Sequence, residues 1–301
     1  MSRLLILCPS HMTRPLGGPK GILGDRIHQL AALQSITSIN PNPLIWPHDN
    51  ITKDLFSSIS VEFIEGNQSD LRVALSREDI FAVIGLFFPT QNCRKSLISD
   101  CHHLIELENM VNETVKAKFH LAQDIHPRGE TPHYIQLIKL ASRILKKELP
   151  DISLPLVKSP LNPTPSKSHG ILLSPLSGSP KHAISKPWWQ SFAKLTEHQT
   201  NLLIPILPQE RENTQRIFED FDHITIVEAS LLETVAIASE GMPTIGIDGG
   251  RLNLLAAGRT LEQKVVGIYG DWPASAWALP NIIPKTQSLK PEEALELLLF
   301  C

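Results

Sequence analysis

The sequence predicts an α/β protein with two doubly wound domains. Short apolar runs typical of buried strands alternate with helical patterns along the chain, and this βαβα order implies parallel sheets with helices on both faces. One segment, Asp151–Gly170, is rich in proline and serine and has no helical period, which is typical of an interdomain connection. We therefore expect domains at residues 1–150 and 170–301, joined by a linker at residues 151–169.

The N-terminal half contains strand-like runs separated by helical patterns. Two helices are clear, Arg26–Gln34 and His133–Leu149, because their apolar residues recur at a spacing of three to four. The strand-like runs are short and continuously apolar, as expected for a sheet buried on both faces. The predicted strands are Leu4–Leu7, Leu44–Trp46, Val61–Ile64 and Phe81–Leu86.

The C-terminal half repeats the same order of strands and helices. Two doubly wound domains place the carboxyl ends of both sheets around a shared cleft, so the sequence predicts a site between the halves. The predicted elements are strand Ile171–Leu173, helix Pro187–Glu197, strand Leu202–Ile206, helix Glu210–Phe218, strand Ile224–Val227, strand Thr244–Ile247, helix Leu252–Ala257 and strand Val265–Tyr269.

Composition excludes several functional classes. The chain of 301 residues is long enough for two cores, and its net charge of −3 gives no nucleic-acid signature. No apolar run approaches the roughly 20 residues that span a bilayer. The N-terminal stretch MSRLLILCPS reads as a strand, because it lacks the apolar core and cleavage site of a signal peptide. We therefore expect a cytoplasmic protein.

Neither the cysteines nor the histidines predict a metal site. His102, His103 and His133 have no carboxylate or cysteine partner at ligand-like spacing. Signatures of P-loop, nucleophile-elbow and HExxH enzymes are missing, and no GxGxxG follows the first strand. We expect free thiols in a reducing cytoplasm. The cysteines are Cys8, Cys93, Cys101 and Cys301.

The most informative motif is Asp248-Gly249-Gly250, which lies between an apolar strand and a helix. A helix opening presents free backbone N–H groups and the positive end of a helix dipole, and both favour a phosphate. Glycine there allows the backbone to approach the anion closely. Because a carboxylate beside an anion is costly, we expect Asp248 to bind a hydroxyl or to orient the loop. This half of the chain is therefore predicted to bind a nucleotide or phosphosugar.

The segment after strand Ile171–Leu173 adds further candidates. Ser177 and Gly178 can donate hydrogen bonds to a phosphate. Lys186 precedes a proline suited to a first helical turn, and a lysine there can neutralise a diphosphate leaving group. The alternative for Lys186 is an ordinary solvated lysine. The following Trp188 and Trp189 are predicted to anchor the core.

Carboxylates open two other helices. Asp25 follows the glycine-rich loop Gly17–Gly21 and precedes the predicted helix, so it is either a general base for a sugar hydroxyl or an N-cap. Glu210 and Glu212 follow a strand, where a carboxylate can bind ribose hydroxyls. Their alternative is an acidic first turn that complements the helix dipole.

Taken together, these motifs resemble glycosyltransferase family 9, the heptosyltransferase family of bacterial lipopolysaccharide assembly. The resemblance covers nearly the whole chain and depends on motifs in the family order. The chain departs from the family signature in several places: Gly249 replaces a hydroxyl residue, Asn253 replaces a histidine, Gly270-Asp-Trp-Pro273 lacks the usual Pro-Thr, and the loop before Asp25 is longer. The matching motifs are Leu23-Gly24-Asp25, Lys186-Pro-Trp-Trp189, Gln209-Glu-Arg-Glu212, Asp248–Ala257, and Val265–Tyr269 with Gly270-Asp-Trp-Pro273.

The resemblance implies a GT-B fold and an inverting transfer from a nucleotide sugar, commonly ADP-heptose, with no metal and no cofactor other than that donor. By position, Asp25 would be the base and Lys186 the phosphate-binding cation. Glu210 or Glu212 would hold the ribose. The donor sugar and diphosphate would be lined by Asp248, Gly249, Gly250 and Asn253, beside Ser177 and Gly178.

The resemblance also implies a glycan or glycolipid acceptor of the lipopolysaccharide type, at the inner face of the cytoplasmic membrane. Arg14 and Lys20 can meet a phosphorylated acceptor or an anionic lipid in peripheral contact, and the alternative is scattered solvated charge. A catalytically silent family member that binds a nucleotide sugar or glycan is the main rival. An epimerase or dehydrogenase of sugar nucleotides is weaker, because the dinucleotide fingerprint is missing.

Overall fold

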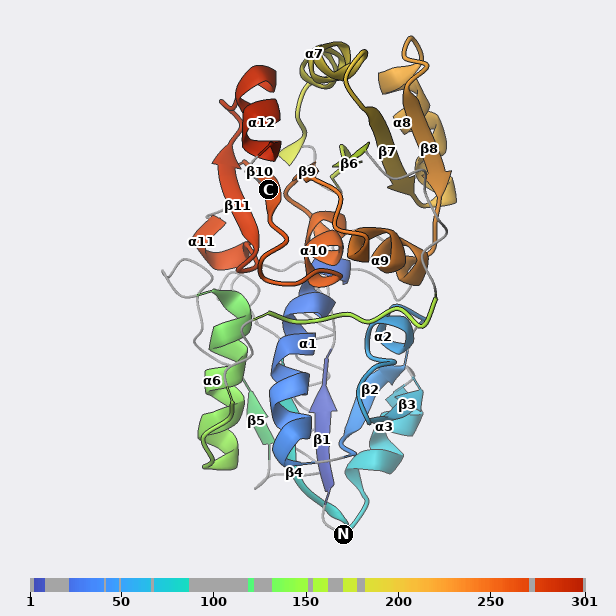
Figure 1. Ribbon diagram of the computed structural model, residues 1–301. Coiled ribbons are helices and arrows are strands. Elements are labelled where there is room, and N and C mark those ends of the chain that lie inside the picture. Colours follow the sequence, from blue (N-terminus) through green and yellow to red (C-terminus); the bar gives the residue numbers. More distant parts are fainter. Residues whose placement is uncertain are drawn as a thin grey trace, which may run out of the picture. The chain divides into compact units, whose positions relative to one another are not determined.

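The chain forms two compact units, Met1–Pro155 and Leu156–Cys301. The division falls inside the segment that the sequence predicts as a linker. Each unit contains one parallel sheet (Figure 1). The computed structural model describes residues 3–8, 22–40, 42–48, 50–65, 68–86, 119–121, 132–150, 154–161, 170–177, 182–270 and 274–299.

Unit 1 contains a five-stranded sheet of order β3-β2-β1-β4-β5 with flanking helices. Its described elements are β1 (Arg3–Leu7), α1 (Ile22–Ile39), β2 (Leu44–His48), α2 (Asn50–Leu55), β3 (Glu62–Glu65), α3 (Gln68–Leu75), β4 (Ile80–Gly85), β5 (Phe119–Leu121) and α6 (His133–Leu145). Helices α1 and α6 pack side by side in Figure 1. Leu5, Trp46 and Leu71 belong to a buried cluster between the sheet and α3.

Two helix boundaries in unit 1 differ from the prediction. Helix α1 begins at Ile22 and not near Arg26, because residues of low helix propensity hide its first turn in the sequence. Helix α6 ends at Leu145 and not at Leu149. The next residue, Lys146, is left-handed with φ 51°, and its backbone N–H bonds the carbonyl of Arg143, which ends the helical ladder.

Unit 2 contains a six-stranded sheet of order β11-β10-β9-β6-β7-β8. Its described elements are β6 (Gly170–Ser174), α7 (Lys186–Thr196), β7 (Asn201–Ile206), η2 (Pro208–Glu210), α8 (Arg211–Phe218), β8 (Ile224–Glu228), α9 (Leu231–Ser239), β9 (Thr244–Ile247), α10 (Gly250–Ala257), β10 (Val265–Tyr269), α11 (Ala274–Trp277), β11 (Ile282–Thr286) and α12 (Pro291–Leu298). Strands β9 and β10 have the predicted bounds, and α10 begins two residues earlier than expected. The predicted doubly wound α/β class is confirmed.

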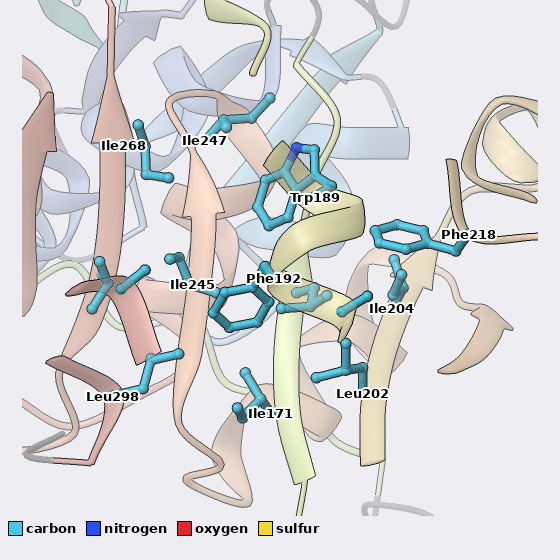
Figure 2. Close-up of a cluster of buried hydrophobic side chains, with 14 of the residues drawn as sticks. Ile171, Trp189, Phe192, Leu202, Ile204, Phe218, Ile245, Ile247, Ile268 and Leu298 are labelled. Carbon is cyan, nitrogen blue, oxygen red and sulfur yellow. The ribbon is translucent and has the colours of Figure 1, made fainter. Parts of the chain in front are cut away.

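Helices cover both faces of the unit 2 sheet. On one face, Trp189 and Phe192 of α7 and Leu298 of α12 pack over the strands, as Figure 2 shows. On the other face, Leu172 of β6 packs against Leu255 of α10 and against α9. Successive strand residues point to opposite faces, so continuous apolar runs serve both layers.

The tryptophan pair anchors the core, as predicted. Trp189 is fully buried. Trp188 is partly buried, its ring stacks on Phe192 with centroids 5.7 Å apart, and its Nε1 donates to the carbonyl of Leu289 at 2.7 Å. The pair therefore attaches α7 to the sheet.

None of the helices in the described ranges is long and apolar enough to cross a membrane. Cys8 is a buried thiol directly after β1. The other cysteines, Cys93, Cys101 and Cys301, lie outside the described residues.

Candidate functional site

Unit 2 has the topological feature at which parallel α/β sheets bind ligands. The chain passes from β6 outward through β7 and β8, and then returns to β9 on the other side of β6. The loops after β6 and β9 therefore leave the same edge of the sheet as neighbours, at its switch point. Ser177 Oγ donates to the carbonyl of Asp248 at 3.0 Å and joins the two loops. The structure thus brings together two predicted site residues.

The Asp248-Gly249-Gly250 motif connects β9 to α10, as predicted. The backbone N–H of Asp248 donates to the carbonyl of Ile268 at 2.8 Å, and Gly249 is the N-cap of α10. Gly249 has an extended backbone that any residue adopts, and a Cβ built on it would lie 3.6 Å from Ser177 Oγ, an ordinary contact. Packing within the protein therefore does not require glycine at this position, and close approach of a ligand remains the predicted reason.

Two other glycines let α10 lie close to the sheet. A Cβ on Gly246 of β9 would come within 3.1 Å of Leu252, and one on Gly267 of β10 within 3.0 Å of the same side chain. Leu252 of α10 fills the space that the two glycines leave open. The first turn of α10 consequently packs directly against β9 and β10 at these two glycines.

A histidine that the sequence analysis missed completes this region. His182 Nδ1 lies 2.8 Å from Asp248 Oδ2, and both side chains are about nine-tenths buried. Burial raises the pKa of Asp248, because the carboxylate loses its hydration, and the neighbouring imidazole opposes this shift. No local motif surrounds His182, so only the fold identifies its partner.

Further buried polar side chains lie on β6, β10 and α10. Ser174 ends β6 and Tyr269 ends β10, and neither hydroxyl has a hydrogen-bond partner among the described residues. Burial, and secondly the charge of Asp248, hold the pKa of Tyr269 well above its ordinary value, so the phenol stays neutral. Asn253 of α10 is buried, and its Oδ1 has no partner within the described ranges. Buried polar atoms of this kind call for an explanation, and a bound ligand is one.

Glu210 joins the end of β7 to the start of α10. Its Oε2 accepts from the backbone N–H of Leu207 at 2.8 Å and from Arg251 Nη2 at 2.5 Å. Arg251 also donates to the carbonyl of Pro205. Burial lowers the pKa of Arg251, which Glu210 opposes. In the sequence, Arg251 stands directly after the glycine pair, which marks it as close to the site. This position does not indicate that its partner is Glu210.

The other two charged candidates of unit 2 lie on exposed surfaces. Glu212 is in the first turn of α8 and pairs with Arg216 one turn later at 2.6 Å, with both side chains mostly exposed. Lys186 is the first residue of α7, is half exposed and pairs with Glu219 at 3.2 Å. No hydrogen bond or ion pair of the described residues joins either side chain to Asp248, so their donor-binding roles remain predictions.

Candidates from unit 1 are only partly described. Asp25 is the fourth residue of α1 and lies in its first turn, so the N-cap interpretation is wrong, because the helix begins at Ile22. Arg14 and Lys20, and Gly178 of unit 2, lie outside the described residues.

Within the described ranges, no group of three or more histidine, cysteine, aspartate or glutamate side chains could hold a metal ion. Asp248 contacts the hydroxyl of Ser177 and the imidazole of His182, and its charge acts on the phenol of Tyr269. Together with the start of α10, they are suited to binding an oxygen-rich anionic ligand.

Solved structures share the fold over almost the entire chain. Escherichia coli heptosyltransferase WaaC with ADP is 14% identical, with 98% of each chain covered and a TM-score of 0.69. A family 9 glycosyltransferase from Veillonella parvula is 11% identical, with 99% and 97% covered and a TM-score of 0.70. Escherichia coli ADP-heptose lipopolysaccharide heptosyltransferase II is 13% identical, with 99% and 98% covered and a TM-score of 0.64.

No family model matches the sequence, and no curated protein matches it. At 11 to 14% identity, similarity to these three structures establishes the fold alone. The two Rossmann-like sheets and the full-length matches confirm the GT-B fold that the resemblance implied.

Proposed function

We propose that this protein is a glycosyltransferase of the family 9 type that takes its sugar from a nucleotide-linked donor. The observation that carries the proposal is the polar switch point of unit 2, where α10 begins beside Ser177, His182 and Asp248. A diphosphate matches the free N–H groups of such a helix start. The similar WaaC structures contain ADP and ADP-2-deoxy-2-fluoro heptose, which supports a nucleotide diphosphate as the ligand class.

The proposed reaction is an inverting, metal-independent displacement. Asp25 takes a proton from the acceptor hydroxyl, and this oxygen attacks the anomeric carbon of the donor sugar. The bond from the anomeric carbon to the diphosphate oxygen breaks, and its electron pair leaves with the diphosphate. The start of α10 and Lys186 stabilise this charge. Lys186 would leave its exposed pair with Glu219, and such pairs are worth only about 0–1 kcal/mol.

Glu210 is the better of the two candidates for binding ribose. Its Oε2 holds Leu207 and Arg251, which fixes the carboxylate and leaves Oε1 for a hydroxyl. Glu212 lies on the exposed part of α8. Arg251 therefore acts in this proposal as a positioning residue.

For the substrates we propose heptose from ADP-heptose and a lipopolysaccharide-type glycan or glycolipid acceptor, which Arg14 and Lys20 would meet at the membrane surface. Titration calorimetry with ADP-, GDP- and UDP-linked sugars tests the donor class. Selective binding of the ADP-linked sugar supports the proposal, and binding of none of the three contradicts it.

Replacing the proposed base tests the chemistry. We expect Asp25→Asn to lower turnover about 10²–10⁴-fold while nucleotide-sugar affinity stays within a few-fold, because a general base acts in the transition state. Asp70→Asn is a matched control, since Asp70 also lies in the first turn of a unit 1 helix. Near-full turnover by Asp25→Asn with the true donor and acceptor would remove Asp25 from this role.

A silent binding protein is the second candidate. Gly249 and Asn253 depart from the donor signature, and the carboxylate of Asp248 is already held by His182. This candidate predicts nucleotide-sugar binding without nucleotide release. A release assay with the donor that binds best, with and without acceptor, separates it from a transferase.

A further inference from the structure

His182 is bound on one side of its ring only. Nδ1 faces the carboxylate of Asp248 at 2.8 Å, while Nε2 is buried and has no hydrogen-bond partner among the described residues. Burying a ring nitrogen without a partner is unfavourable, and native structures rarely do so. The missing partner of Nε2 is therefore expected to be a ligand.

The surroundings of His182 indicate which charge a ligand at Nε2 should carry. The contact of Nδ1 with the carboxyl group of Asp248 fixes the orientation of the ring. Asp248 directly precedes Gly249, the N-cap of α10, so His182 contacts the residue that comes just before the positive end of that helix. The neighbouring phenol of Tyr269 is neutral. The positive end of α10 therefore favours an anion as the ligand.

We propose that His182 binds the diphosphate of the nucleotide-linked donor through Nε2–H, and that Asp248 positions the ring for this contact. The inference rests on the proposed function and deepens it by assigning a phosphate-binding side chain in addition to Lys186. Asp248 then contributes to donor binding through His182, in addition to any contact of its own. A hydrogen bond from Nε2–H to an anionic phosphate oxygen also stabilises the leaving group without a metal.

Two substitutions separate this role from a purely structural pair. In His182→Asn, the side-chain amide nitrogen takes roughly the place of Nδ1, so the bond to Asp248 can persist while Nε2 is lost. In His182→Gln, the longer amide can reach roughly the place of Nε2 as a neutral donor. His198→Asn is the matched control, because His198 is exposed just beyond α7.

The experiment is titration calorimetry of the full chain with ADP and with adenosine, alongside thermal unfolding of each variant. We expect His182→Asn to unfold near the wild-type temperature and to bind ADP about 10–100-fold more weakly, as for loss of a charged hydrogen bond. Adenosine affinity should change less than about threefold, because adenosine has no phosphate to meet Nε2. His182→Gln should recover part of the loss, and His198→Asn should behave as wild type.

The alternatives give different results. Equal weakening for ADP and adenosine, or ADP affinity unchanged in a folded His182→Asn, would overturn the role of His182 and leave the proposed function intact. Weakening seen only with an ADP-linked sugar and not with ADP would reassign Nε2 to the sugar and overturn the diphosphate contact. If the wild type binds no ADP at all, both this inference and the proposed ADP-linked donor fail. If His182→Asn does not fold, the same titrations with His182→Gln decide: unchanged ADP affinity overturns the contact.

Discussion

Single residues decide whether the switch point of unit 2 can hold an anion. Asp248 would be poorly tolerated as an isolated buried carboxylate, and its pKa is accordingly raised by burial. His182 offsets that penalty by direct contact, and Ser177 bonds the carbonyl of the same residue. Because of these contacts, the residue before the helix start is held in one orientation.

The reason for a glycine differs between positions 241 and 249, and two substitutions distinguish the two reasons. Gly241 follows α9 with φ +79°, whereas Gly249 is extended. We expect Gly241→Ala to destabilise the protein by about 1–2 kcal/mol, because a Cβ disfavours the left-handed region. Gly249→Ala should stay within about 0.5 kcal/mol of wild type. Urea unfolding measures both, and a large loss for Gly249→Ala would show that packing requires that glycine.

At the scale of elements, the candidate site includes the start of α10, and α9 supports this helix. Helix α9 packs against α10. Ser230 caps α9, since its hydroxyl accepts from the backbone N–H of Glu233 at 3.3 Å and Glu233 Oε2 accepts from that of Ser230 at 2.7 Å. This capping box satisfies two backbone donors that a helix start leaves open.

The capping box predicts a defined acid dependence of stability. Hydrogen bonds from Ser230 lower the pKa of Glu233 below its ordinary 4.5. The folded state therefore favours the carboxylate, so its stabilisation is complete above pH 4.5 and is lost as pH falls through the folded pKa. Glu233→Gln should reduce the fall in Tm between neutral and acid pH, because the amide keeps an acceptor that does not titrate.

The control for this measurement is Glu292→Gln. Glu292 also lies in a first turn, that of α12, but Glu293 makes the capping bond there. Thermal unfolding followed by circular dichroism at several pH values is sufficient. An identical acid dependence in wild type and Glu233→Gln would contradict the role assigned to the capping box.

At the scale of the whole molecule, each unit has its own sheet and its own buried cluster. In unit 2, the backbone N–H of Val157 donates to the carbonyl of Ala257 at 2.9 Å, which attaches part of the predicted linker to the end of α10. The boundary of the folding unit therefore lies before residue 170, where the sequence predicted the domain to start.

We accordingly expect residues 154–301 to fold when expressed alone. The fragment contains a six-stranded sheet with helices on both faces, and it is within the size range of ordinary domains. Circular dichroism should show one cooperative thermal transition, and calorimetry should show that the fragment binds the same nucleotide as the full chain. A fragment beginning at residue 170 serves as comparison and should be less stable. Equal stability of the two fragments would contradict a structural role for residues 154–161.

The sequence by itself determined the class of the fold and nine of the eleven described strands, whereas β5 and β11 were not predicted. Runs such as Thr244–Ile247 and Val265–Tyr269 are apolar and are bounded by turn residues. This pattern is typical of a strand that is buried on both faces of a sheet. Helix ends were less predictable, because the left-handed Lys146 and the early start of α1 have no clear signal in composition. Motifs that are contiguous in sequence, above all Asp248-Gly249-Gly250, were correctly placed at a strand–helix junction.

Only the tertiary structure decided which residues surround that junction. Ser177 and His182 reach Asp248 from the connection after β6, and Arg251 reaches Glu210 from the first turn of α10, so each contact joins segments far apart in the chain. Their partners depend on the reversal of strand order between β6 and β9, which sets two distant loops side by side. Periodicity and spacing in a sequence indicate which side of a segment is exposed to water and which nearby residues it contacts. A buried imidazole and its carboxylate come into contact only after the sheet has formed.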